Sequence, residues 1–297
     1  MGAKGYNLTT TVSNFNISYD DLGEGNVPII FLHGYPFDKS MWQPQLEFLQ
    51  VSNRVIAVDL RGFGTSKDEE TSLSIGIFAD DLIKFMNALD IDKAIICGLS
   101  MGGYIALNAV NRFPSRFEAL ILCNTQCSAD TKEAKEKRYK TIDDISKNDV
   151  IPFNEGFVKS VFYAGSLLNK KEIVESLRTV VFSNSKHIIT MGLRVLADRS
   201  ESCSTLSEIN IPTLIICGRE DALIPVAKAE SLHATIKNSS LKIINHAGHV
   251  SNLEQPQEFN KHLCDFIVSI GGGDCRDIQR IKADERRNNR STAVWDL

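Results

Sequence analysis

Short apolar runs alternate with amphipathic stretches along most of the chain. Runs rich in Ile, Val and Leu predict strands at residues 29–32, 54–58, 94–97, 119–123, 213–217 and 242–244. They show little polar alternation, so both faces of each strand should be covered, as in a parallel sheet. Helical patterns fill the intervals at residues 41–50, 73–89, 101–112, 225–236 and 256–269. Residues 8–19 predict antiparallel edge strands, and the series as a whole predicts an α/β protein with one doubly wound sheet.

The alternation stops between residues 125 and 205, where helical patterns at 131–143, 153–162 and 171–182 follow one another without a strand run. Helices inserted between two parallel strands are expected to cap the carboxyl ends of the sheet; packing helices remote from any site are the alternative. The predicted organisation is therefore a core of residues 1–124 and 206–270 with a helical cap at 125–205.

The stretch 271–297 begins with a triple glycine and carries mixed charge without an apolar face. These features predict a disordered or loosely docked tail. A partner-binding segment anchored on Ile278, Ile281 or Trp295 is the alternative. Because the tail offers little apolar surface for burial, we expect the fold and the chemistry to reside in the residues before it.

Composition narrows the function classes. The chain has 297 residues, of which 43% are hydrophobic and 24% charged, with a net charge of -4. This balance favours neither nucleic acid nor an anionic membrane as a partner. No apolar run approaches the roughly 18 residues of a membrane span, and the N-terminus lacks the apolar region of a signal peptide. We therefore expect a cytoplasmic protein that acts on a small molecule; its oligomeric state stays open.

The 7 cysteines bear on compartment and cofactor. Several of them, among them Cys97, Cys123 and Cys217, sit inside apolar runs. Buried free thiols in a reducing cytosol explain this placement better than a disulfide framework or a zinc site. The cysteine and histidine spacings match no metal-ligand pattern, so we expect neither a metal nor an organic cofactor.

The strongest chemical signal is GLSMG at residues 98–102, which joins a predicted strand to a predicted helix. A serine at such a turn has strained backbone, and bulky residues two positions away would clash, which accounts for Gly98 and Gly102. The start of the following helix directs free N–H groups at negative charge that develops beside Ser100. A serine in an ordinary tight turn is the alternative, but the strand before it and the helix after it favour a nucleophile.

GLSMGGY, together with HGYP at 33–36, DLRGFGTS at 59–66, GREDALIP at 218–225 and HAGH at 246–249, resembles the α/β-hydrolase superfamily. The likeness is strongest to its small serine esterases, 3-oxoadipate enol-lactonases and perhydrolases. It covers about residues 15–270, with the cap region matched least and the tail not at all. The resemblance implies an α/β-hydrolase fold, a mostly parallel sheet with an inserted helical cap, and a triad in the order Ser, acid, His.

An acyl-transfer site needs N–H donors for the tetrahedral oxyanion. The backbone N–H of Met101, the residue after the nucleophile, is one expected donor. The loop after strand 29–32 should supply the other; Pro36 has no N–H, which leaves Tyr35, and the resemblance implies the same position. His33 in this loop is expected to brace the backbone rather than take part in catalysis.

His249 is the expected base. It follows the strand at 242–244 and precedes a loop that leads into the helix at 256, the placement of the catalytic histidine in the resembled family. Its neighbour His246 is the alternative at the same strand end. The other candidates, His187, His233 and His262, lie in helical stretches and are simply surface or core residues.

The expected acid is Asp221, which follows strand 213–217 and matches the family position. Its neighbour Glu220 is the alternative. Some relatives place the acid after the preceding strand, but Asn124 stands there and cannot stabilise an imidazolium as a carboxylate does. Asp59 and Arg61 are also charged and lie at a strand end; they are expected to tie down a glycine-rich loop.

These residues predict cleavage of a small carboxylic ester or lactone through an acyl-enzyme on Ser100. Perhydrolysis, C–C bond hydrolysis by the same triad, or a ligand receptor or signalling protein on the same fold remain alternatives. Side chains expected to line the substrate pocket, each equally suited to plain core, are Tyr35, Leu99, Trp42, Phe153, Phe157, Phe162, Leu223 and Val250.

Overall fold

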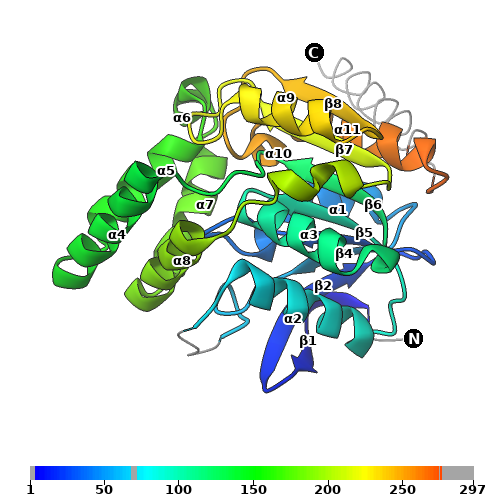
Figure 1. The fold of residues 1–297 in the computed structure, drawn as a ribbon, viewed down its shortest axis with the longest axis horizontal. Coiled ribbons are helices and arrows are strands. Elements are labelled where there is room, and N and C mark those ends of the chain that lie inside the picture. The colour runs from blue at the N-terminus through cyan, green and yellow to red at the C-terminus, as the bar shows by residue number, and fades with distance from the viewer. Residues whose placement is uncertain (1–3, 68–71, 274, 276–297) are drawn as a thin grey trace, which may run out of the picture.

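The computed structural model describes residues 4–67, 72–273 and 275, and its centre is one eight-stranded sheet with the order β1-β2-β4-β3-β5-β6-β7-β8 (Figure 1). The hairpin of β1 and β2 is antiparallel and joins β4, and all later neighbours pair in parallel. The strands are β1 (Gly5–Val12), β2 (Phe15–Leu22), β3 (Ile29–Leu32), β4 (Val55–Val58), β5 (Ala94–Leu99), β6 (Phe117–Cys123), β7 (Thr213–Gly218) and β8 (Ser239–Ile244). The predicted α/β fold class is confirmed.

Helices cover both faces of the sheet, which explains why β3 and β4 are apolar at every position. In β3, Ile30 and Leu32 belong to one hydrophobic cluster while Ile29 and Phe31 belong to another, and all four side chains are fully buried. The first cluster includes side chains of α2 (Ile75–Ala88), α3 (Met101–Arg112) and α9 (Val226–Thr235). The second includes side chains of α1 (Gln43–Leu49) and α11 (Pro256–Ser269).

A helical insertion separates β6 from β7 and extends to one side of the sheet in Figure 1. Its helices are α4 (Lys132–Lys147), α5 (Ile151–Val161), α6 (Ala164–Asn169), α7 (Lys171–Ser183) and α8 (Lys186–Asp198). Side-chain caps begin two of them, because Thr131 accepts a hydrogen bond from the Ala134 N–H and Ser185 accepts one from the Ile188 N–H. The expected helices at 131–143, 153–162 and 171–182 correspond to α4, α5 and α7, whereas α6 and α8 were not predicted.

Short elements account for the remaining differences from the sequence pattern. The helix expected at 41–50 is divided into a 3₁₀ turn, η1 (Lys39–Trp42), and α1, which has Pro44 in its first turn. Further 3₁₀ turns are η2 (Pro114–Arg116) and η3 (Cys203–Glu208). The helix α10 (Ser251–Glu254) has four residues. Within the described ranges, no helix is both long enough and apolar enough to cross a membrane.

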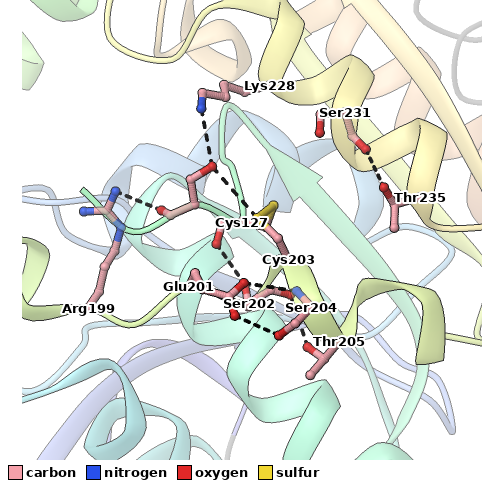
Figure 2. Close-up of a disulfide and its surroundings, with 11 residues drawn as sticks. Cys127, Arg199, Glu201, Ser202, Cys203, Ser204, Thr205, Lys228, Ser231 and Thr235 are labelled. Carbon is pink, nitrogen blue, oxygen red and sulfur yellow. Dashed lines mark hydrogen bonds between the residues drawn. A yellow bond between two sulfur atoms is a disulfide. The ribbon is translucent and has the colours of Figure 1, made fainter. Parts of the chain in front are cut away.

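The prediction that all cysteines are free is wrong. Cys97, Cys123 and Cys217 are buried free thiols, but Cys127 is bridged to Cys203 and Cys264 to Cys275. Cys127 and Cys203 are 76 residues apart in sequence, yet their Cα atoms are 4.8 Å apart, so the bridge joins the segment that follows β6 to η3, which precedes β7 (Figure 2). The expectation of a reducing compartment rested on free thiols and loses that support.

The second bridge reaches into the segment predicted to be a tail. Cys275 is fully buried and lies 5.7 Å, Cα to Cα, from Cys264 in α11. The start of this segment is therefore fastened to the core. The rest of the predicted disordered tail, residue 274 and residues 276–297, lies outside the described residues.

Candidate active site

Ser100 occupies a strained turn between β5 and α3. Its φ of 53° and ψ of -112° lie where an L-residue is rarely found. The flanking glycines make the turn possible: a Cβ on Gly98 would lie 2.2 Å from the carbonyl oxygen of Gly102, and one on Gly102 would lie 2.3 Å from that of Leu32. Strand, turn and helix therefore present the Ser100 hydroxyl in the way that the sequence motif predicts.

His249 and Asp221 form a buried pair beside this turn. The Nδ1 atom of His249 lies 2.8 Å from Oδ2 of Asp221. The other carboxylate oxygen, Oδ1, accepts the backbone N–H groups of Leu223 and Ile224 at 2.9 Å each, which fixes the carboxylate in the turn after β7. Burial alone would raise the pKa of Asp221, but the adjacent His249 and the hydrogen bonds outweigh it and hold this pKa below its usual value.

Asn124, at the end of β6, supports this pair. Its Nδ2 donates to Asp221 Oδ2 at 2.9 Å and to the Gly248 carbonyl oxygen at 3.1 Å. Its Oδ1 accepts a hydrogen bond from Ser251 at 2.6 Å. The residue that sequence reasoning set aside as an unsuitable acid is thus a second side-chain partner of Asp221, besides His249, and a link to the loop that carries His249.

The alternative base lies elsewhere. His246 is exposed and its ring stands 5.8 Å from that of Tyr163.

His33 is fully buried, with Nδ1 donating to the Gly34 carbonyl at 2.8 Å and Nε2 accepting the Leu60 N–H at 3.0 Å. Burial lowers the pKa of His33, so the ring is neutral and braces the loop after β3, the structural role expected for it.

The other charged candidates hold structure. Asp59 accepts the backbone N–H groups of Lys39 at 2.8 Å and Thr65 at 2.9 Å, so it ties two loops together. Arg61 makes two hydrogen bonds to Asp81 in α2, at 2.7 and 2.6 Å. Glu220 accepts the Ala247 N–H at 3.0 Å and is only half-buried. None of these three side chains lines the cavity at Ser100.

Ser100 and His249 open into one cavity of about 330 Å³. On the core side, its wall includes Tyr35, Tyr104, Gln126, Leu223 and Ile224. On the insertion side, α4, α5 and α8 contribute the wall, with side chains that include Phe153, Phe157, Leu193, Leu196 and Lys137. The inserted helices therefore close the space above the turn that carries Ser100.

Half of the side chains expected to line the substrate pocket line the cavity, and half do not. Tyr35, Phe153, Phe157 and Leu223 line it. Leu99, Trp42, Phe162 and Val250 do not; all four belong to the buried cluster on the face of α1 and α11. The Trp42 ring lies 5.0 Å from that of Phe31 and 6.2 Å from that of Phe259, so it packs the core.

The two backbone N–H groups that the sequence suggested for binding an oxyanion are those of Met101 and Tyr35. Met101 is the first residue of α3, where N–H groups have no partner within the helix. Tyr35 lies in the loop after β3. Its side-chain hydroxyl donates a hydrogen bond to the Ile189 carbonyl oxygen at 2.8 Å, which leaves its backbone N–H as the group to consider. Within residues 4–67, 72–273 and 275, neither backbone N–H donates a hydrogen bond.

Sequence reasoning missed several residues that line the cavity. Tyr104 lies within the quoted GLSMGGY motif, and Gln126 follows the end of β6 by three positions. Leu193 and Leu196 lie on α8, whose apolar residues recur at helical spacing and would have predicted the helix. In the described part of the chain, no group of three His, Cys, Asp or Glu side chains is placed to hold a metal ion.

Similarity to known proteins covers most of the chain. Residues 27–256 match the model of the family described as alpha/beta hydrolase fold. Over 261 residues the chain is 30% identical to 3-oxoadipate enol-lactonase 2 of Acinetobacter baylyi, covering 88% of this chain and 96% of that protein. A thermophilic esterase from Thermogutta terrifontis superposes with a TM-score of 0.84 at 29% identity, covering 89% of this chain and 98% of the esterase. For the enol-lactonase of Burkholderia xenovorans the TM-score is 0.81 at 25% identity, with 88% and 100% covered.

Proposed function

Because the chain belongs to the alpha/beta hydrolase fold family, we propose that it is a serine hydrolase that cleaves small carboxylic esters or lactones through an acyl-enzyme on Ser100. One observation carries the proposal: the strained turn presents Ser100 to the same cavity as His249, whose Nδ1 is held 2.8 Å from the buried Asp221. Esterase and enol-lactonase relatives support the reaction class.

In the proposed reaction, Ser100 is first acylated by the substrate and the acyl-enzyme is then hydrolysed, and His249 accepts and returns a proton in each of these two steps. His249 takes the Ser100 proton on Nε2 while Nδ1 stays bonded to Asp221, and Ser100 Oγ attacks the carbonyl carbon. The N–H groups of Tyr35 and Met101 stabilise the oxyanion. The alcohol oxygen takes the proton from His249 as its bond to the carbonyl carbon breaks; an ester releases the alcohol, and a lactone ring opens. A water molecule then gives a proton to His249 and attacks the acyl-enzyme, and His249 returns the proton to Ser100 Oγ as the acid is released.

The cavity bounds the substrate. Its volume of about 330 Å³ is near the lower end of the usual range for small-molecule sites, roughly 300 to 1,000 Å³. Aromatic and aliphatic side chains from the insertion form the wall opposite Ser100. We therefore expect a short to medium acyl group or a small lactone ring.

Rates on p-nitrophenyl esters of increasing acyl length and on simple lactones test the proposal. We expect turnover of short esters and a loss of roughly 10⁴- to 10⁶-fold in Ser100→Ala, whose fold should stay intact. Circular dichroism and the melting temperature serve as controls. Unchanged hydrolysis by Ser100→Ala contradicts the proposal, and peracid formation from acetate and hydrogen peroxide faster than ester hydrolysis would favour perhydrolysis instead.

A further inference from the structure

The backbone around His249 is held by the helical insertion as well as by the core. The His249 N–H donates to the carbonyl oxygen of Val161, the last residue of α5, at 2.8 Å. Gly248 packs so closely that a Cβ there would lie 2.7 Å from the backbone nitrogen of Tyr163. The segment that joins α5 to α6 is therefore in direct contact with the two residues that place the base.

Glu254, at the end of α10, joins these two segments. Its side chain is fully buried. Oε1 accepts the Tyr163 N–H at 2.7 Å, and Oε2 accepts the Gly248 N–H at 2.6 Å. A carboxylate has only acceptors, so it can satisfy two N–H donors from different segments at once.

Burial makes the ionised form of Glu254 unfavourable, and its neighbours partly offset this effect. Burial raises its pKa, while hydrogen bonds from Ser166 and from the two backbone N–H groups, and the positive charge of Lys170, act in the opposite direction. The Lys170 ammonium also hydrogen-bonds the Glu254 carbonyl oxygen. A buried carboxylate needs such hydrogen bonds and a nearby positive charge to offset its loss of hydration, so its position is coupled to the groups that donate to it.

We propose that Glu254 is a positioning residue that fixes the backbone before His249 to the insertion, so that the placement of the insertion also places the base. The inference rests on the proposed role of His249. The ring of His249 is then anchored to the core through Asp221 and its backbone to the insertion through Glu254 and Val161. A displacement of about 1 Å at such a group can cost roughly 100-fold in rate.

Glu254→Gln tests this with little change in shape. An amide offers one acceptor and turns its NH₂ toward the other N–H, so one of the two bonds is lost. We expect kcat to fall about 10- to 100-fold with KM changed less than about twofold. Glu220→Gln is the matched control. Among the described residues, the Glu220 side chain accepts only the Ala247 N–H, from the loop after β8, and an amide oxygen can accept it too, so kcat should stay within about twofold.

A second pair of variants decides the matter even if Glu254→Gln folds poorly. Tyr163 has φ -61° and ψ 141°, and Phe162 before it is extended, so proline fits the backbone at 163. Tyr163→Pro removes the N–H that Glu254 binds and places Cδ against the carboxylate, whereas Tyr163→Ala removes only the ring. We expect Tyr163→Pro to lower kcat at least about fivefold below Tyr163→Ala, with similar KM.

The outcomes separate this inference from the proposed function. An active wild type with unchanged kcat in a folded Glu254→Gln variant, or equal kcat in Tyr163→Pro and Tyr163→Ala, overturns the positioning role alone. A wild type that hydrolyses no ester or lactone overturns the proposed function and the positioning role with it. A lower kcat at unchanged KM and unchanged melting temperature, absent from Glu220→Gln, is the result that supports Glu254.

Discussion

The two walls of the cavity are built in different ways. On the core side, Ser100 sits in a strained turn and His249 is bonded to the buried Asp221, so each reactive group has a single position. On the insertion side, the wall consists mainly of apolar side chains such as Phe153 and Leu193 on separate helices. Under the proposed function, we therefore expect changes in the core wall to alter whether a bond is cleaved and changes in the insertion wall to alter which substrate is accepted.

The contacts that hold each wall differ in the same way. The core groups are fixed by buried hydrogen bonds, such as those of Asn124 to Asp221 and Gly248. Between α4 and α8, in contrast, Lys135 and Asp198 form an ion pair at 2.7 Å with both side chains nearly half exposed. Exposed ion pairs contribute little to stability. Substitution of this ion pair should therefore be tolerated, whereas buried contacts to the insertion, such as that of the Tyr35 hydroxyl with the Ile189 carbonyl oxygen, should not be.

The largest effect is expected at the base. His249→Gln should lower the rate on every ester by at least about 10⁴-fold, because the described residues that line the cavity include no other histidine and no carboxylate to take the Ser100 proton. His246→Gln, three residues earlier and exposed, should leave the rates within about twofold, since surface changes away from a site are small. Kinetics on one short and one longer ester measure both. Loss of activity in His246→Gln with activity kept in His249→Gln would reverse the assignment.

The acid should come next. Asp221→Asn should lower the rate by roughly 10³ to 10⁴ on all substrates, because the amide favours the wrong imidazole tautomer and cannot balance its charge. Glu220→Gln should leave the rate within about twofold, because an amide oxygen can accept the same Ala247 N–H that Glu220 accepts. If Glu220→Gln were the more damaging of the two, the wrong carboxylate has been assigned.

The pKa of Asp221 also predicts acid sensitivity. Because this pKa is lowered in the folded protein, the ionised carboxylate contributes stability above its ordinary value, near 3.8. That contribution is lost as the pH falls through the lowered value. Relative to wild type, Asp221→Asn should therefore lose less stability between pH 6 and pH 3, measured by urea unfolding. A parallel loss in both proteins would count against the buried pair.

On the insertion wall we expect selectivity to change instead. Phe153→Ala should enlarge the cavity and raise the ratio of kcat/KM for an octanoyl ester over an acetyl ester about tenfold, since each methylene in a pocket is worth about that much or more. Acetyl ester turnover should change less than about threefold. Phe182→Ala, on α7 and outside the cavity lining, is the matched control. Equal chain-length profiles in all three proteins would show that this wall does not select.

The smallest effect on rate is expected for the disulfide between Cys127 and Cys203, which joins the two ends of the insertion. Replacing Cys127 and Cys203 by serine should lower the melting temperature by several degrees, because the bridge closes a loop of 76 residues and such bridges stabilise by about 2 to 4 kcal/mol. The Cys264–Cys275 bridge spans only 11 residues, so its removal should cost less. Short-ester rates should stay within about threefold in both. Scanning calorimetry that ranks the two bridges the other way would contradict this.

Local sequence features predicted the core wall well. Strands β3 and β4 are unbroken apolar runs because both of their faces are buried, and the turn at Ser100 is constrained by Gly98 and Gly102 at fixed distances along the chain. Asp221 and His249 follow directly after β7 and β8, so their place at one edge of the sheet follows from strand order. Each of these inferences depends only on neighbours in sequence.

The insertion wall could not be predicted in the same way. A pocket and a core use the same residue types, so the sequence could not distinguish Trp42, which packs against Phe259, from Phe153, which lines the cavity. The bridge between Cys127 and Cys203 depends on where the chain returns after 76 residues, which spacing does not reveal. Contacts between distant segments decide both cases.

Covalent labelling tests the central claim most directly. A fluorophosphonate reacts only with an activated serine, so peptide mass spectrometry after labelling identifies the nucleophile without knowledge of the substrate. We predict one adduct per chain, on Ser100, with no labelling of Ser100→Ala and strongly reduced labelling of His249→Gln. An adduct on any other serine, or labelling that persists in Ser100→Ala, would contradict the assignment of Ser100 as the nucleophile.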